Sequence, residues 1–329
     1  MSLTALITGV AGQDGVLLAR HLTSAGYRVV GTTRPGVRSA LHPYLSGVAI
    51  EEHDLRDAAG FERLLEIYSP SEVYNLAGFT SVAASWDDPG LVHEVNAAAV
   101  DSMLGPLAKR GIKFFQASSS EVFGPDAANP QNESTAYDPR NPYAESKTLA
   151  QQALTRARDE EGLFACVGIL YNHESPLRSR QFVTRKITHA AAEIGEGLRE
   201  TVALGNLTVS RDWGSARDYV VAMHAVLQQD TPSDYVIASG TLHTLGDLLE
   251  TAFACVGIAD PWPYVVQDPA LLRKEDAPGL TGDAAKARRD LGWSPTTLFE
   301  DLVRTMVAVD QRRIRTGIAE DPTYLDAAG

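Results

Sequence analysis

The stretch YAESK, from Tyr143 to Lys147, sets a phenol and an ammonium group four residues apart. Residues at this spacing lie on one face of a helix, so the lysine charge can stabilise the phenolate and lower the tyrosine pKa. Tyr143 could then act as a general base toward a hydroxyl group. The same spacing occurs by chance in many helices, and a surface pair without a catalytic role is the alternative.

A run of hydroxyl groups and one carboxylate precedes this helix. Ser118, Ser119, Ser120 and Glu121 follow the apolar run FFQA, which is typical of a buried strand. Such hydroxyls can hydrogen-bond a reacting alcohol and move protons beside a carboxylate, although a capped turn with an exposed acid fits equally well. Ligands of open parallel sheets bind at the carboxyl ends of the strands, which favours a site that combines this turn with Tyr143.

The amino-terminal stretch ALITGVAGQDG predicts a cofactor site. A strand runs into Gly9, Gly12 and Gly15, and a helix is predicted over 13–25. Glycines so placed permit a tight turn and close approach of a phosphate, which the free amides at the start of the helix favour. A dinucleotide is the expected ligand, and a purely structural glycine turn is the alternative.

The residues after the second and third predicted strands bear on the choice of nucleotide. In dinucleotide-binding folds an acidic side chain there binds the ribose 2′-hydroxyl, whereas an arginine accepts a 2′-phosphate. The strand RVVGTT ends at Arg34, which favours NADP over NAD, with a solvated arginine as the alternative. Asp54, after the third strand, could meet the adenine amine or could cap the helix predicted near 57.

The elements that must position these residues form a regular pattern. The apolar runs TALIT, RVVGTT, GVAIEE, EVYNLA, KFFQAS and FACVGIL alternate with helices predicted over 13–25, 57–68, 89–109 and 143–161. This order is typical of an α/β fold, with a doubly wound parallel sheet covered by helices on both faces. After about residue 172 the pattern loosens, and a smaller second lobe is expected.

Composition excludes several other functions. The 29 Lys and Arg against 42 Asp and Glu give a net charge of −13, which disfavours binding to nucleic acid or an anionic membrane. No apolar run is long enough to span a bilayer, and the amino terminus lacks the basic region of a signal peptide, so a cytoplasmic protein is expected. The eight histidines show no metal-ligand spacing, so no metal is expected; Cys166 and Cys255 are expected to be free thiols, with a disulfide as the lesser alternative.

The motifs together resemble a known family, the GDP-mannose 4,6-dehydratases of the extended short-chain dehydrogenase/reductases. The stretches that carry the resemblance span residues 5 to about 310: ALITGVAGQDG, YNLAG, FFQASSSEVFG, NPYAESK, ILYNHESP, FVTRKI, LGNL with RDWGSARDYV, DYVIASG and LTGDAAKARRDLGW. The resemblance implies a Rossmann-like NADP-binding domain over 1–172 and 211–240. It further implies a nucleotide-sugar lobe over 173–210 and 241–315. The polar, Gly- and Ala-rich composition of the last residues predicts a frayed tail over 316–329.

The resemblance also implies a reaction. Tyr143, assisted by Ser119 and Lys147, would deprotonate the sugar 4-hydroxyl while hydride passes from C4 to NADP⁺. The resulting ketone makes the C5 proton acidic, and Glu121 would remove that proton and help to expel the 6-hydroxyl as water. The hydride then returns to C6, so no cofactor is consumed. A reductase or epimerase acting on a related 4-keto nucleotide sugar is the alternative.

The family pattern extends to further site residues. Those implied on the cofactor side are Gly9, Gly12, Gln13, Asp14, Gly15, Arg34, Asp54, Leu55, Leu76, Ala77, Gly78, Tyr143, Lys147, His173 and Arg178. Those implied on the substrate side are Ser81, Ser120, Asn172, Lys186, Arg211, Arg273 and Asp276. Three cations among them suit a diphosphate, which needs close positive donors on a protein of this net charge.

The sequence departs from the family pattern in three places. GFTSV at 78–82 stands where AQSHV is common, and Arg180 stands where the family commonly has an acid. The loop after Arg34 is shorter than the arm through which many relatives form tetramers. A homodimer is therefore expected, with a tetramer as the alternative, and with the helices near 89–109 and 143–161 as its symmetric contact.

Overall fold

The first part of the chain builds a large parallel sheet. The computed structural model describes residues 3–271 and 279–326. Within this part of the chain, a seven-stranded sheet has the order β10-β6-β5-β4-β1-β2-β3, and all neighbouring strands are parallel. Its strands are β1 (Thr4–Thr8), β2 (Arg28–Thr33), β3 (Ala49–Glu52), β4 (Glu72–Asn75), β5 (Lys113–Ser119), β6 (Ala165–Leu170) and β10 (Tyr235–Ile237).

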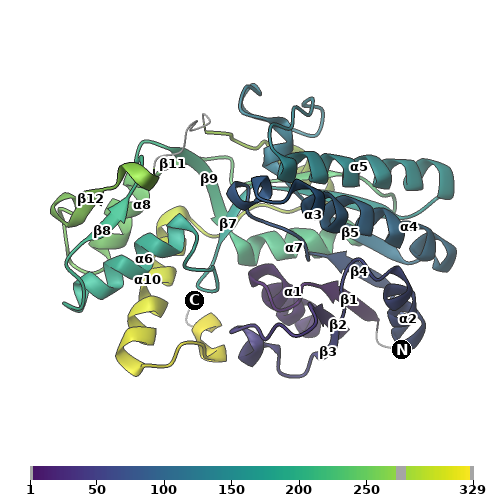
Figure 1. Ribbon diagram of the computed structural model, residues 1–329, viewed down its shortest axis with the longest axis horizontal. Helices are drawn as coiled ribbons and strands as arrows, with labels where there is room; N and C mark the ends of the chain where they lie inside the picture. Colours follow the sequence, from purple (N-terminus) through teal and green to yellow (C-terminus); the bar gives the residue numbers. More distant parts are fainter. Residues whose placement is uncertain (1–2, 272–278, 327–329) are drawn as a thin grey trace.

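Helices cover both faces of this sheet (Figure 1). On one face, α1 (Gln13–Ser24) and α7 (Ala216–Leu227) pack over one hydrophobic core. On the other face, α2 (Ala58–Tyr68), α4 (Ala99–Arg110) and α5 (Pro142–Glu161) pack over a second core. Because both faces are covered, β4 and β6 are buried along their whole lengths. The predicted doubly wound α/β fold is confirmed.

The strand order places the predicted site at one edge of the sheet. Strands β2 and β3 lie on one side of β1, whereas β4, β5, β6 and β10 lie on the other. The chain direction across the sheet therefore reverses between β1 and β4. Open α/β sheets bind ligands in the crevice outside the strand ends at such a reversal. The glycine turn after β1 and the segment 76–78 after β4 both lie there.

The helix predicted over 89–109 differs from the expectation in its middle turn. It consists of α3 (Pro89–His93), a π-helical turn η3 (Glu94–Ala98) and α4. Asn96 lies in the π-helical turn, and its carboxamide bonds to both the amide and the carbonyl of Phe79, at 2.8 and 3.1 Å. We attribute the wider turn to this contact, because single π-helical turns are frequent where a functional side chain must be positioned.

A smaller lobe lies at the left of Figure 1. Its helices α6 (Val183–Gly195), α8 (Leu245–Ala254) and α10 (Phe299–Thr316) enclose a third core. A mixed sheet of order β11-β9-β7 joins β11 (Leu242–Thr244), β9 (Ser210–Ser215) and β7 (Asn172–Glu174). Two further strands, β8 (Val202–Leu204) and β12 (Val265–Gln267), pair in parallel, and short 3-10 turns η5 (Trp262–Tyr264) and η6 (Pro269–Leu271) flank β12.

Two segments make contacts near the predicted boundary between the lobes. Strand β9 pairs with β7 and β11 in the mixed sheet. Ala284, Ala287 and Trp293, in and around α9 (Ala285–Leu291), belong to the core beneath α1 and α7. The domain boundaries stay a prediction.

The expectation of a frayed carboxyl-terminal tail is wrong for residues 317–326. Tyr324 and Leu325, in the 3-10 turn η7 (Pro322–Leu325), are 1% and 4% exposed. Glu320 forms an ion pair with Arg313 at 2.6 Å and accepts a hydrogen bond at 2.8 Å from Tyr44, in the 3-10 turn η1 (His42–Leu45). The segment therefore joins α10 to the loop after β2, a long-range packing that its polar composition does not indicate.

Candidate active site

The first turn of α5 brings the predicted catalytic pair together. Asn141 caps this helix by accepting a hydrogen bond from the amide of Ala144 at 2.9 Å, and Pro142 occupies the first helical position. Tyr143 and Lys147 then lie on one face, with the lysine Nζ 5.8 Å from the centre of the phenol ring. Lys147 donates to the carbonyl oxygen of Ala117, at the end of β5, at 2.9 Å. The pair thus faces the carboxyl edge of the sheet.

Burial shifts the pKa of both groups. Lys147 is 6% exposed, and the loss of hydration lowers its pKa from 10.5 to about 8. Burial raises the pKa of Tyr143 to about 12, a hydrogen bond to Ser119 opposes this rise, and the negative charge of Glu121 adds to it. A positive charge near the phenol is therefore needed before Tyr143 can serve as a base at neutral pH.

Ser119 and Glu121 complete a group of four side chains around the phenol. Ser119 ends β5 and caps the 3-10 turn η4 (Ser120–Phe123), and its hydroxyl accepts a hydrogen bond from the amide of Glu121 at 3.3 Å. The Glu121 carboxylate accepts a hydrogen bond from the Asn141 side chain at 3.3 Å and is only half-exposed. The four side chains predicted to be catalytic are thus gathered in one place.

The glycine turn has the shape that a dinucleotide requires. Gly9 has a φ of +71°, and a Cβ there would lie 2.9 Å from the backbone of Ala77. A Cβ on Gly15 would lie 2.4 Å from the carbonyl oxygen of Gly9. Gly12 is the first-turn cap of α1 and carries no side chain to block its free amides. These residues, with 76–78 across the crevice, fit a bound diphosphate.

Two exposed arginines stand beyond the glycine turn. Arg34 and Arg38 lie in the loop after β2, and neither guanidinium contacts an acid within residues 3–271 and 279–326. The loop is tied to the turn because the hydroxyl of Ser39 donates to the carbonyl of Ala11 at 2.8 Å. A phosphate at the ribose end of a dinucleotide would meet these cations.

Asp54 does not cap a helix, so that alternative is wrong. The cap of α2 is Asp57, which accepts a hydrogen bond from the amide of Gly60 at 2.8 Å. Asp54 is paired with Arg56 at 2.7 Å, and hydrogen bonds from Arg56 lower the pKa of its carboxyl to about 2. Leu55 beside it is buried. The proximity of Asp54 to adenine stays a prediction.

Residues predicted for the cofactor from two distant segments contact each other. The Gln13 side chain donates to the carbonyl of His173 at 3.1 Å, and the imidazole Nε2 of His173 lies 2.8 Å from an oxygen of Asp14. Arg178 is paired with Glu174 at 3.1 Å and lies over the ring of Phe182. Its charge acts on both Asp14 and Tyr143. The segment 173–178 therefore lies near both the glycine turn and Tyr143.

The residues predicted to bind the substrate lie on several separate elements, and the hydrogen bonds given below do not join them to one another. Ser81 accepts a hydrogen bond from the amide of Ala84 at 3.2 Å, in the 3-10 turn η2 (Ala83–Trp86), and Ser120 is buried. Arg211 lies on β9 and donates to the carbonyl of Ser210 at 2.7 Å. The rest are half-buried or not described: Asn172 on β7 and Lys186 on α6 are half-buried, whereas Arg273 and Asp276 lie outside the described residues. Arg180 is exposed and contacts the imidazole of His189.

Comparison with known proteins now decides the family. The family model described as GDP-mannose 4,6 dehydratase matches residues 6–306. The chain belongs to this family.

Individual relatives of this dehydratase agree. GDP-mannose 4,6 dehydratase 2 of Arabidopsis thaliana is 41% identical, over 98% of this chain and 91% of its own. The structure of RMD from Pseudomonas aeruginosa complexed with NADPH gives a TM-score of 0.81 at 24% identity, and covers 95% of this chain and 100% of that one. A dTDP-glucose 4,6-dehydratase from Bacillus anthracis in complex with NAD gives 0.81 at 17% identity, over 93% and 96%. Both solved structures therefore share the fold of this chain.

The family assignment confirms the predicted resemblance. It places the chain among nucleotide-sugar 4,6-dehydratases and not among the reductases and epimerases that were the alternative. Both cysteines are free, as expected. No group of three or more metal-ligating side chains occurs within the described part of this dehydratase.

The sequence analysis missed Asn141, which links the start of α5 to Glu121 in η4. The oxygen of its carboxamide caps α5, while the nitrogen donates a hydrogen bond to Glu121. The dipeptide Asn141–Pro142 is a helix-start signal and could have shown the cap, although not the contact with Glu121.

We expect Asn141→Ala to lower the free energy of unfolding by about 1 kcal/mol and to lower activity through a displaced Glu121. Asn141→Ser, which retains the capping oxygen, should restore stability but not activity. Chemical denaturation and product formation measure the two effects. Equal recovery of both by serine would contradict the role assigned to the amide nitrogen.

A row of buried polar side chains beneath the site was also missed. Thr8 donates to Asn75, Asn75 donates to Gln116 at 2.8 Å, and Gln116 donates to the carbonyl of Ala117 at 2.8 Å, the same carbonyl that receives Lys147. Thr8 and Asn75 end β1 and β4, and Gln116 lies within β5. Polar residues at the ends of otherwise apolar strands are the only sequence signal for such a row, and only the pairing of the strands shows that they connect.

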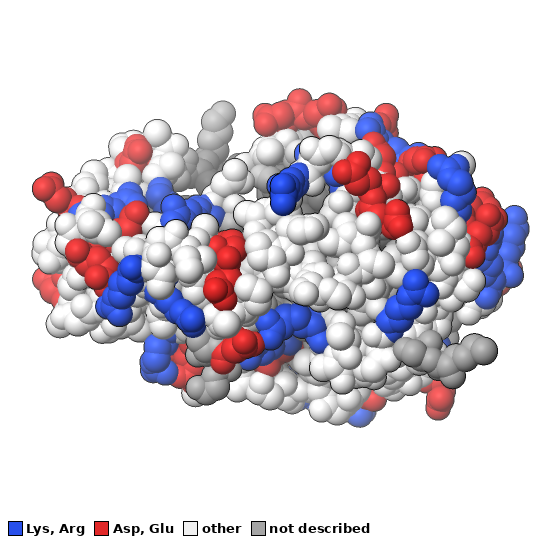
Figure 2. Space-filling view, turned by 90° about the horizontal axis from the view of Figure 1, so that it is seen from below, with Lys and Arg blue, Asp and Glu red and all other residues white. Residues whose placement is uncertain are grey.

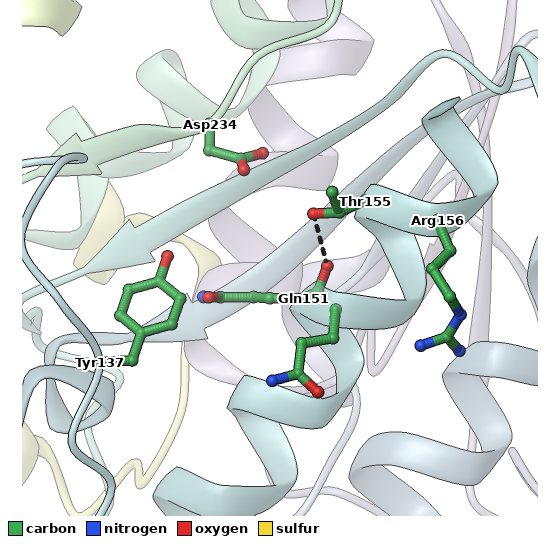
Figure 3. A pocket seen from close by; sticks show the side chains of 6 residues that line it. Tyr137, Gln151, Thr155, Arg156 and Asp234 are labelled. Atoms are coloured by element: carbon green, nitrogen blue, oxygen red, sulfur yellow. Dashed lines mark hydrogen bonds between the residues drawn. The ribbon is translucent and has the colours of Figure 1, made fainter. Parts of the chain in front are cut away.

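A separate pocket lies further along α5 (Figure 3). Its lining residues are Tyr137, Gln151, Gln152, Thr155, Arg156 and Asp234. None of the predicted site residues lines it. Gln151 borders it and donates to Ser118, the residue before Ser119, so one of the residues that line this pocket contacts the end of β5.

Proposed function

We propose that this dehydratase converts GDP-mannose to its 4-keto-6-deoxy product with NADP as cofactor. The observation that carries the proposal is the position of Glu121. A dehydration needs a second base besides the tyrosine, and Glu121 is held beside Tyr143 by Asn141 and Ser119. The named relatives support GDP-mannose as the substrate.

The side chains divide the proton transfers between them. When bound, the nicotinamide ring accepts a hydride from the sugar and later returns it. Tyr143 takes the proton of the sugar 4-hydroxyl, and Ser119 hydrogen-bonds the same oxygen. Lys147, together with the positive ring, lowers the pKa of the phenol toward neutrality. Glu121 then takes the acidic C5 proton and delivers a proton to the departing 6-hydroxyl, which leaves as water.

The nucleotide sugar is bound by the smaller lobe in this proposal. Lys186 and Arg211 supply positive charge toward its diphosphate, and Arg273 and Asp276 are further candidates from the segment outside the described residues. Asn172, Ser81 and Ser120 would meet the sugar and its neighbours. Bidentate or charge-assisted hydrogen bonds to phosphate favour such cations on a protein with a net charge of −13.

The product of the reaction tests the function directly. The protein is incubated with NADP⁺ and, separately, with GDP-, UDP-, dTDP- and CDP-hexoses, and mass spectrometry follows the sugar nucleotide. The expected result is loss of one water from GDP-mannose without net formation of NADPH. Stoichiometric oxidation or reduction of a sugar, with no loss of water from any of them, would refute the proposal.

The choice of NADP is supported by Arg34 and Arg38, two exposed arginines after β2. A 2′-phosphate would draw them into charge-assisted hydrogen bonds, each of which contributes about 1.5–3 kcal/mol. We therefore expect Arg34→Ser to weaken NADPH binding by about tenfold or more and to leave NADH binding unchanged. Fluorescence titration of the two cofactors measures this, with Arg63→Ser on α2 as the control. An equal loss for both cofactors would contradict a 2′-phosphate contact.

The expected oligomeric state of this dehydratase also gives a testable proposal. We propose a homodimer formed through the faces of α4 and α5 that point away from the sheet, where Leu149 is 46% exposed. Sedimentation velocity distinguishes this dimer from a monomer or a tetramer.

No helix in the described ranges is long and apolar enough to cross a membrane. Acidic and basic side chains are interspersed over the face in Figure 2. We propose a cytoplasmic location, which cell fractionation would test.

A further inference from the structure

A half-buried acid lies at the point where the proposed diphosphate would bind. Asp14 is the second residue of α1, two positions after the glycine cap, and its side chain is 23% exposed. The free amides of this first turn are the groups that favour a phosphate. A carboxylate in the same turn opposes a phosphate, because like charges repel strongly where water is excluded. The site therefore requires a compensating positive charge.

The surroundings of His173 indicate that this residue supplies the charge. Its Nε2 lies 2.8 Å from a carboxylate oxygen of Asp14, and its Nδ1 lies 2.7 Å from the carbonyl oxygen of Tyr171. Both partners can only accept hydrogen bonds when Asp14 is ionised. A neutral imidazole carries one N–H and can satisfy only one of them, whereas an imidazolium satisfies both. The geometry alone thus favours the doubly protonated ring.

The other groups around the ring agree with this assignment. Tyr219 of α7 stacks on the imidazole with ring centres 4.7 Å apart, and an aromatic face favours a cation. Arg178 is the other charge near the ring and is itself paired with Glu174. Burial alone would lower the pKa of His173, but the charge of Asp14 and the two hydrogen bonds outweigh it and raise the pKa above 6.5. The pKa of Asp14 is correspondingly lowered.

The side chain of Gln13 holds Asp14 and His173 beside each other. Its amide nitrogen donates to the carbonyl of His173 at 3.1 Å and to Asp14 at 3.1 Å, and its oxygen accepts a hydrogen bond from Ser175 at 2.9 Å. The start of α1 is thereby joined to β7 and to the turn that follows it.

We propose that His173 acts as a counter-charge: as an imidazolium it neutralises Asp14, so that an anionic dinucleotide can bind at the start of α1. The inference rests on the proposed cofactor site and adds to it a positioning role for a residue predicted only to line the cofactor. In this role the imidazole need not touch the dinucleotide. Its effect is transmitted through Asp14.

A double-variant cycle on dinucleotide affinity tests the inference. NADPH binding is followed at pH 7 by fluorescence titration for the unchanged protein, His173→Gln, Asp14→Asn and the double variant. We expect His173→Gln to weaken binding by about tenfold or more, because it leaves a half-buried, uncompensated carboxylate. We expect the double variant to bind within about threefold of the unchanged protein, because neither charge is then present. The matched control is His224→Gln. His224 is a half-buried histidine on α7 that contacts His21 on α1.

The pH dependence supplies a second readout. As pH rises through the raised pKa of His173, the imidazolium is lost and Asp14 is left uncompensated. The affinity of the unchanged protein should therefore fall more steeply above pH 7 than that of the double variant. Any contribution from Lys147, whose pKa is about 8, is common to both proteins and cancels in the comparison.

The outcomes are distinguishable. If the double variant binds as weakly as His173→Gln, the imidazole acts as a direct ligand or a packing element and the inference is overturned. It is likewise overturned if His173→Gln binds normally. Circular dichroism and thermal unfolding show whether a weak variant is folded, and an unfolded single variant beside a folded, binding double variant would support the charge argument. Failure of the unchanged protein to bind NADPH would refute the proposed cofactor itself, and this inference with it.

Discussion

Replacing Glu121 with glutamine is expected to lower the rate of water elimination by about 10²–10⁴-fold, the usual contribution of a positioned proton-transfer group. Glutamine keeps the size of the side chain and can still hydrogen-bond Asn141, so the local structure should persist. It cannot accept the C5 proton. Dinucleotide affinity should be unchanged, because the proposed division of roles assigns Glu121 to the sugar and not to the dinucleotide.

The variant should also separate the first step from the second. Oxidation at C4 depends on Tyr143, Ser119 and Lys147, so mixing the variant with NADP⁺ and GDP-mannose should produce reduced nicotinamide that persists instead of being returned. Stopped-flow absorbance follows this signal, and mass spectrometry follows the loss of water. Glu145→Gln is the matched control. Glu145 is in the first turn of α5 with Tyr143, but its side chain is 50% exposed and lies near His93. Normal elimination by Glu121→Gln would refute the assignment of the second base.

Much of this site could be predicted from the sequence because its signals are local. The glycine turn, the strand that precedes it and the helix that follows it lie within residues 4–24, and α1 begins where predicted. The spacing of Tyr143 and Lys147 needs only a helix, which α5 provides. The parallel sheet with helices on both faces follows from alternating strands and helices. Such features are fixed by backbone geometry and the hydrophobic pattern.

The parts that could not be predicted depend on contacts between distant segments. The pairing of Asp14 with His173 joins residues that are 159 positions apart, and the contact between Tyr44 and Glu320 joins residues 276 apart. No local pattern marks Glu320 as buried, since its neighbours are polar. The π-helical turn at Glu94–Ala98 likewise arises because Asn96 must reach Phe79. Each of these is a tertiary contact that overrides a local preference.

Lys147→Met is expected to have opposite effects on activity and on stability. Activity should fall by about 10²–10⁴-fold, because the variant lacks the cation that, together with the positive nicotinamide ring, stabilises the Tyr143 phenolate in the proposed mechanism. Stability at pH 7 should rise by on the order of 1–3 kcal/mol, because the variant no longer holds a charged ammonium group in a buried position. The carbonyl of Ala117 keeps its hydrogen bond from Gln116, so no buried acceptor is left without a donor.

The pH dependence of this gain follows from the shifted pKa. Lys147 has a pKa of about 8 in the folded protein against 10.5 when unfolded, so between these values the unfolded state binds more protons. Stability of the unchanged protein therefore rises with pH across this window, and the penalty is fully present below about pH 8. The advantage of Lys147→Met should be largest at pH 7 and should shrink toward pH 10. Denaturant unfolding at pH 7 and at pH 9.5 measures this change. A variant that is less stable than the unchanged protein at pH 7, or whose advantage is the same at both pH values, would contradict the view that the lysine charge is held in place for catalysis at a cost in stability.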